Sequence, residues 1–94
     1  MTTSDSLVLI DFYAEWCGPC KKMEPYLKEI AVDMKDRVKV IRLDVDANQQ
    51  LAKELNIEEL PILHLYKNKE LVWSNKGYIG KEEVLKKLNK ELSI

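Results

Sequence analysis

The sequence predicts an α/β fold in which a four-stranded mixed sheet carries helices on both faces. Two observations support this prediction. Short runs rich in β-branched and aromatic residues alternate with segments whose apolar residues recur at helical spacing, in the order β-α-β-α-β-β-α. The length of 94 residues is enough for one compact domain but not for two, so we expect a single domain over residues 1–94.

The first strand is predicted at residues 7–13, where every residue except Asp11 is apolar or aromatic. Such a run is typical of a strand that is buried on both faces, as in a parallel sheet. The strongest helix of the chain follows, with Pro19 suited to its first turn and apolar residues at helical spacing as far as Met34. Pro25 lies inside this helix and should kink it, because the proline ring removes one hydrogen bond.

The remaining elements are shorter. We expect a strand at 38–43, a short helix near 48–55, two strands at 62–66 and 70–74, and a last helix at about 81–92. Residues 67–69 are few enough to connect the last two strands as a hairpin, and Gly80 suits the N-cap of the last helix. Strand–helix–strand units imply parallel neighbours with right-handed crossovers, and the hairpin adds an antiparallel edge.

Composition and charge exclude several classes of function. The 15 basic residues nearly cancel the 16 acidic ones, and a net charge of −1 argues against a nucleic-acid or anionic-membrane binder. No apolar run approaches about 18 residues, so the sequence predicts no transmembrane segment. The first six residues have no basic n-region and no cleavage motif, so we expect a cytoplasmic protein.

The two cysteines of the chain, Cys17 and Cys20, form one Cys-x-x-Cys directly after the first strand and at the start of the long helix. At a helix N-terminus, free N–H groups and the positive end of the macrodipole favour a thiolate at the first cysteine. The second cysteine would lie one turn inside the helix, close enough to close a small disulfide ring. We therefore expect Cys17 to attack a substrate disulfide and Cys20 to resolve the mixed disulfide.

The alternative for this pair is a structural or metal-binding dithiol. A closed zinc site needs about four ligands. The single histidine, His64, lies inside a predicted strand, where sheet packing is its expected role, so a metal site would require a dimer. Redox chemistry is therefore favoured, with the Cys17–Cys20 pair as the redox group and no further cofactor or metal.

Several motifs together resemble the thioredoxin family, and the resemblance covers nearly the whole chain from Leu7 onward. They are the run from Asp11 through Trp16-Cys17-Gly18-Pro19-Cys20 to Lys21, Pro25 five residues after Cys20, Leu60-Pro61 before a strand, and Gly77 before the last helix. The resemblance implies a thioredoxin-like fold and a thiol–disulfide oxidoreductase that reduces protein disulfides. It also implies a cis Leu60–Pro61 bond beside the active-site cysteines.

Asp11 lies in a run otherwise suited to complete burial, and a lone buried carboxylate is costly. The resemblance implies that it is a buried proton acceptor that activates Cys20 in the resolving step. The alternative is a carboxylate satisfied by a polar neighbour near the strand end. Arg42, on the adjacent predicted strand, matches a family lysine near this carboxylate, although a solvated strand end explains it equally well. We expect burial to raise the pKa of Asp11 and to outweigh Arg42.

The resemblance also implies a substrate groove around Cys17. This groove would bind disulfide-containing protein substrates, and a thioredoxin-reductase-like enzyme would be the electron donor. We expect the protein to be a monomer. The substrate-binding residues would be Trp16, Gly18, Pro19, Leu60, Pro61 and Gly77.

The chain departs from the family pattern at several points. Sixteen residues precede Cys17, so we expect a reduced form of the fold without the strand and helix that usually come first in the family, and with one sheet face thinly covered. Lys69 replaces a hairpin glycine, although it is less suited to positive φ. Gly-Pro between the cysteines supports a reductase, whereas the charged groove residues Glu59 and Lys76 leave open a partner-specific oxidase or isomerase. A non-catalytic binding module would not need Cys17, Cys20, Asp11 and Pro61 together.

Overall fold

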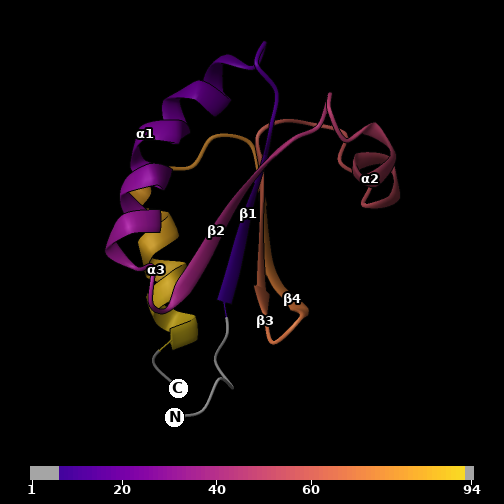
Figure 1. The fold of residues 1–94 in the computed structure, drawn as a ribbon. Helices are drawn as coiled ribbons and strands as arrows, with labels where there is room; N and C mark the ends of the chain where they lie inside the picture. Colours follow the sequence, from indigo (N-terminus) through magenta and orange to yellow (C-terminus); the bar gives the residue numbers. More distant parts are fainter. Residues whose placement is uncertain (1–6, 93–94) are drawn as a thin grey trace.

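The computed structural model describes residues 7–92, which form a four-stranded mixed sheet and three helices (Figure 1). The predicted order of elements is confirmed, with small differences at their ends. The elements are β1 (Leu7–Tyr13), α1 (Gly18–Asp33), β2 (Val38–Asp44), α2 (Gln49–Glu54), β3 (Ile62–Lys67), β4 (Glu70–Lys76) and α3 (Lys81–Leu92).

The strands lie in the order β2-β1-β3-β4. β1 and β2 are parallel, as predicted, but β3 is antiparallel to β1 as well as to β4. The expectation that the second strand–helix–strand unit would also be parallel is therefore wrong. The reason is the short α2: its 6 residues rise only about 9 Å, far less than a strand of this sheet, so it cannot return the chain along the sheet. α2 instead lies to the side of the sheet, near the end of the strands from which β3 starts (Figure 1).

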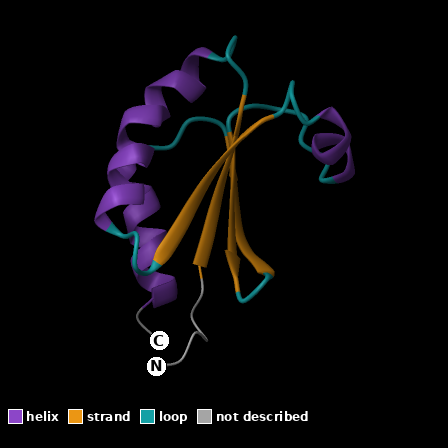
Figure 2. Ribbon diagram, viewed as in Figure 1, coloured by secondary structure: helices purple, strands orange, loops and turns teal. Residues whose placement is uncertain are grey.

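The main core lies between the sheet and the two longer helices. α1 and α3 pack side by side against one face, and α2 lies on the other side of the sheet (Figure 2). From α1 the core takes Met23, Tyr26, Leu27 and Ile30, from α3 Val84 and Leu88, and from the sheet Leu7, Leu9, Val38, Leu63 and Leu65. Because α2 covers little of the second face, Val8 and Ile10 are only half-buried. The prediction that β1 is buried on both faces is wrong there, whereas thin cover of one face is confirmed.

α1 holds the redox pair at one end and remains a single helix past Pro25. Its N-cap residue is Cys17, and a proline occupies its first turn as predicted. The Tyr26 hydroxyl donates a hydrogen bond to the Ile79 carbonyl oxygen over 2.5 Å, which ties the middle of α1 to the segment before α3. The helix is therefore anchored both to the sheet and to the loop that follows β4.

Candidate active site

Cys17 and Cys20 are joined by a disulfide at the N-terminus of α1, with their Cα atoms 5.3 Å apart. Cys17 has the extended backbone of an N-cap residue, and its Sγ accepts a hydrogen bond from the Cys20 backbone N–H over 3.2 Å. This geometry places the Cys17 sulfur at the free N–H groups that favour a negative charge at a helix N-terminus. Both cysteines are buried, while their neighbours Trp16, Gly18 and Pro19 are exposed.

The segment before β3 lies against the disulfide. Leu60 packs on the small cluster that contains both cysteines and Ala14. The Leu60–Pro61 bond is cis, as the family resemblance implied, and Pro61 is fully buried. The Gly77 N–H donates to the Pro61 carbonyl oxygen over 2.8 Å, and Gly77 has a φ of 92°, a conformation that favours glycine. Leu60 therefore contacts the cysteine cluster, and Gly77 is hydrogen-bonded to Pro61, the next residue along the chain from Leu60.

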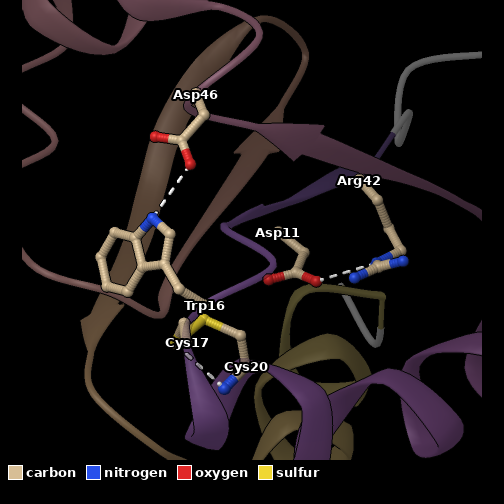
Figure 3. The surroundings of a disulfide bond; sticks show 6 residues. All are labelled: Asp11, Trp16, Cys17, Cys20, Arg42 and Asp46. Carbon is tan, nitrogen blue, oxygen red and sulfur yellow. Dashed lines mark hydrogen bonds and ion pairs between the residues drawn. A yellow bond between two sulfur atoms is a disulfide. The ribbon is translucent and has the colours of Figure 1, made fainter.

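Trp16 has a partner that sequence reasoning missed. Its indole Nε1 donates a hydrogen bond to Asp46 Oδ2 over 2.9 Å (Figure 3). Asp46 follows β2, whose end lies beside the end of β1 because the two strands are parallel. Acidic residues directly after the second strand were the signal in the sequence, since the ends of neighbouring parallel strands meet at one edge of the sheet.

Asp11 is completely buried on β1, and its side chain lies between the disulfide and Arg42 in Figure 3. Arg42, at the paired position on β2, places its Nε 3.3 Å from Asp11 Oδ2. The other oxygen, Oδ1, has no hydrogen-bond partner among residues 7–92. Burial raises the pKa of Asp11 above its usual value, although the hydrogen bond and charge of Arg42 act in the opposite direction. The expected direction of the shift is confirmed, and Arg42 is a partner of this carboxylate rather than an isolated strand end.

Two further side chains hold Arg42, and sequence reasoning missed both. Its Nη1 lies 3.3 Å from Glu24 Oε2 on α1, and its guanidinium carbon lies 3.9 Å from the centre of the Tyr13 ring. The Arg42 side chain is 27% exposed, so this stacking and pairing occur at a partly desolvated site. Glu24 comes one helical turn after Cys20, and that spacing was the available signal that it shares a face with the redox pair.

His64 lies on the opposite face of the sheet from the Asp11 side chain, because alternate residues of β3 face opposite sides. It is buried, and its ring makes an edge contact with Phe12 at 4.9 Å between ring centres. Its Nδ1 has no hydrogen-bond partner in the described part of the chain, and burial lowers its pKa. These contacts agree with the expected packing role.

Among residues 7–92, no group of three or more His, Cys, Asp or Glu side chains is arranged to hold a metal ion. No helix in this same range is long and apolar enough to cross a membrane.

An α/β sheet with a Cys-x-x-Cys disulfide at the N-terminus of its longest helix defines a class, the dithiol–disulfide oxidoreductases. The sequence model named Thioredoxin matches residues 1–90. The chain is 44% identical over 85 residues to a thioredoxin-like protein of Synechocystis sp., a match that covers 90% of this chain and 78% of that protein. It is 40% identical over 90 residues to thioredoxin of Bacillus subtilis, covering 96% of this chain and 86% of the relative.

The fold is similar to that of chloroplastic thioredoxin z. The crystal structure of that protein superimposes with a TM-score of 0.86 at 29% identity, over 96% of this chain and 81% of the other. The chain belongs to the thioredoxin family, and it is a thiol–disulfide oxidoreductase that reduces protein disulfides. Its substrates are disulfide-containing proteins, and a reductase partner restores the dithiol.

Proposed function

We propose that Cys17 is the attacking cysteine and Cys20 the resolving cysteine of this protein-disulfide reductase. The observation that carries the proposal is the N-cap position of Cys17, whose Sγ accepts the backbone N–H of Cys20. In the dithiol form the same N–H group and the macrodipole of α1 stabilise a thiolate at Cys17. Cys20 lies inside the first turn and has less access to a substrate, with 1% of its surface exposed against 4% for Cys17.

The reaction proceeds in two exchanges. The Cys17 thiolate attacks one sulfur of the substrate disulfide, so that a Cys17–substrate bond forms and the second substrate sulfur leaves as a thiolate. Cys20 then loses its proton and attacks Cys17 Sγ. The Cys17–Cys20 bond forms, the Cys17–substrate bond breaks, and the first substrate sulfur leaves as a thiolate. Two electrons have passed from the protein dithiol to the substrate, whose thiolates take up protons from the medium or from Asp11.

Asp11 is proposed as the acceptor of the Cys20 proton. A general base is most effective when its pKa lies near the operating pH. Burial of Asp11 moves its pKa upward, in the direction that this role requires. Its Oδ1 is available for a proton, because no residue between 7 and 92 hydrogen-bonds to it. If water connects Cys20 to this oxygen, the role is the same.

We propose that the substrate docks on the exposed rim around Cys17. The packing of Leu60 against the cysteines and the bond from Gly77 to Pro61 support this location. An extended substrate segment would pair with the backbone before Pro61 as a short added strand. The rim residues are Trp16, Gly18, Pro19, Leu60, Pro61 and Gly77.

The finer identity of the partners is part of the same proposal. The electron donor would be a thioredoxin-reductase-like enzyme, and the protein would act as a monomer in a reducing compartment, the cytoplasm. A dithiol reductase needs a reducing supply of electrons, which cytosolic thiol systems provide. The redox pair would need no added cofactor, and the net charge of −1 gives no support to nucleic acid or an anionic membrane as a partner.

Trapping experiments test the assignment of the two cysteines. Cys20→Ser should accumulate a mixed disulfide between Cys17 and a protein substrate, because the resolving thiol is absent. Cys17→Ser should accumulate none. Alkylation of the reduced protein at neutral pH, followed by peptide mass spectrometry, should modify Cys17 first. Faster alkylation of Cys20, or trapping by Cys17→Ser, would show that the assignment is wrong.

A further inference from the structure

A cavity of about 270 Å³ reaches Cys20 from the side of β2. Its walls include Tyr13, Cys20, Glu24 and Arg42, which come from β1, α1 and β2. Asp11 is fully buried, and its Oδ2 lies 3.3 Å from Arg42. Arg42 thus links the cavity wall to the carboxylate that the proposed mechanism uses.

Arg42 is shared between two carboxylates. Its Nε lies 3.3 Å from Asp11 Oδ2, and its Nη1 lies 3.3 Å from Glu24 Oε2. The Tyr13 ring supports the flat side of the guanidinium at 3.9 Å. The guanidinium therefore contacts Asp11 through Nε, while its Nη1 pairs with Glu24. In this arrangement Asp11 Oδ1 has no hydrogen-bond partner from residues 7–92.

A guanidinium and a carboxylate ordinarily prefer to form two parallel hydrogen bonds. If Glu24 were absent, Arg42 would be free to turn toward Asp11 and engage both of its oxygens. That contact would block Oδ1 and favour the ionised carboxylate. The groups that act on Asp11 are Arg42 from β2 and Glu24 from α1, and the Tyr26 hydroxyl of α1 also interacts with it. From β3, the position paired with Asp11 is occupied by the uncharged Leu63.

We propose that Glu24 is a positioning residue for the resolving step: it holds Arg42 so that Asp11 keeps one oxygen free to accept the proton of Cys20. The inference rests on the proposed role of Asp11 as proton acceptor. The proton passes from Cys20 Sγ to Asp11 Oδ1, and the Cys20 thiolate then displaces the substrate thiolate from Cys17. The negative charge of Glu24 also raises the pKa of Asp11, in agreement with two carboxylates that share the Arg42 guanidinium.

Glu24→Ala tests this inference, with Glu29→Ala as its matched control. Both residues lie on α1 and both pair with a lysine, but Glu29 pairs with Lys81, away from Asp11. Two quantities are measured over a range of pH: the single-turnover rate of substrate release from the mixed disulfide, and the titration of the Asp11 carboxyl carbon by NMR in the dithiol form. Glu24→Ala should move the Asp11 titration to lower pH and reduce the plateau rate at high pH about two- to fivefold, the range of a partly exposed ion pair.

Two further comparisons separate this role from a structural one. Glu24→Gln keeps an oxygen that accepts from Arg42, so its plateau rate should lie between those of wild type and Glu24→Ala. In an Asp11→Asn background, Glu24→Ala should have no additional effect on the rate. Denaturant unfolding should show that both variants stay folded under the conditions of the rate measurements. Glu24→Ala removes ion pairs with Lys28 and Arg42, and Glu29→Ala removes one with Lys81.

The outcomes distinguish the inference from the mechanism on which it rests. If Asp11→Asn resolves mixed disulfides as fast as wild type, the proposed role of Asp11 fails. If Asp11→Asn is slow but Glu24→Ala behaves like Glu29→Ala, only the role of Glu24 is wrong. A shift of the Asp11 titration to higher pH in Glu24→Ala, or an undiminished Glu24 effect in the Asp11→Asn background, would likewise overturn it.

Discussion

Trp16 and Asp46 lie 30 positions apart in the sequence but are joined by a 2.9 Å hydrogen bond from the indole Nε1 to a carboxylate oxygen. Trp16 is 71% exposed, so burial does little to fix its ring beside the disulfide. Asp46 is itself oriented, because its backbone N–H donates to Asp44 Oδ1 over 2.9 Å. The position of the Trp16 ring therefore depends on the loop after β2.

Removing this bond should weaken substrate binding more than it slows the chemistry. Asp46→Ala should raise the KM for a protein disulfide about two- to tenfold, the range of one hydrogen bond, with a smaller change in kcat. Asp46→Asn is the control, because its amide oxygen still accepts from the indole. Steady-state kinetics and the NMR resonance of the Trp16 indole N–H measure the two effects. An unchanged KM together with a displaced indole resonance would show that the ring does not contribute to binding.

The turn between β3 and β4 contains two non-glycine residues with positive φ, Asn68 at 53° and Lys69 at 72°. A lysine is unfavourable in this conformation, and glycine adopts it without steric cost. Lys69→Gly should therefore raise the free energy of unfolding by about 0.5–1 kcal/mol, after the greater entropy of glycine in the unfolded chain is included. Lys76→Gly, in β4, should lower it by a similar amount because the strand needs no positive φ. Urea denaturation measures both, and a less stable Lys69→Gly would contradict the argument.

The bond from the Tyr26 hydroxyl to the Ile79 carbonyl oxygen should contribute measurably to stability. Tyr26→Phe leaves that carbonyl without this donor and should lower the free energy of unfolding by about 0.5–1.5 kcal/mol. Tyr78→Phe makes the same chemical change at a side chain that is 56% exposed, so it should have little effect. Burial raises the pKa of the Tyr26 hydroxyl, so the bond should persist in alkaline solution.

Hydrogen exchange locates the effect of Tyr26→Phe. The amides of residues 77–80 should exchange faster than in wild type, since the hydroxyl holds the segment before α3. Amides in the hairpin between β3 and β4 should not change. Equal losses of stability in Tyr26→Phe and Tyr78→Phe would show that the hydroxyl of Tyr26 contributes nothing specific.

The parts of the site that the sequence predicted depend on neighbours along the chain. Cys17 and Cys20 lie at the junction of a strand and a helix, both of which local residue patterns identified, and one turn of helix determines their separation. The prediction for β3 failed because strand direction depends on where α2 lies, which is not a local property. The sequence predicts a short helix near residues 48–55, but local patterning does not show where that helix lies relative to the sheet.

Residues that contribute to the site from other elements were harder to predict. Glu24, Tyr13 and Asp46 are an ordinary surface glutamate, a strand tyrosine and a loop aspartate in the sequence. Each acquires its role through a contact across elements: with Arg42 for the first two, and with Trp16 for the third. Asp11 was identifiable, in contrast, because a carboxylate in an apolar strand conflicts with its immediate surroundings.

The buried Asp11 carboxyl should make stability depend on pH in a defined direction. Its pKa is raised in the folded protein, chiefly by burial, so the native state keeps the proton at pH values where the unfolded chain has lost it. The slope of the unfolding free energy with pH is proportional to the number of protons bound by the unfolded state minus the number bound by the native state. For Asp11 this difference is negative. The contribution of Asp11 is therefore greatest below the unfolded value of about 3.9, falls as pH rises through the folded pKa, and then stays constant.

Asp11→Asn removes this loss while keeping the shape of the side chain. The free energy of unfolding of Asp11→Asn minus that of wild type should therefore be more positive at pH 8 than at pH 5. The disulfide is kept closed so that the cysteines do not titrate, and His64, whose pKa burial lowers, is present in both proteins and cancels. Asp36→Asn, at an exposed position after α1, is the control for the same change of net charge. Urea denaturation at the two pH values decides the matter. If Asp11→Asn is less stable than wild type by a larger margin at pH 8 than at pH 5, Arg42 outweighs burial, and Asp11 is a well-paired structural carboxylate rather than a proton acceptor.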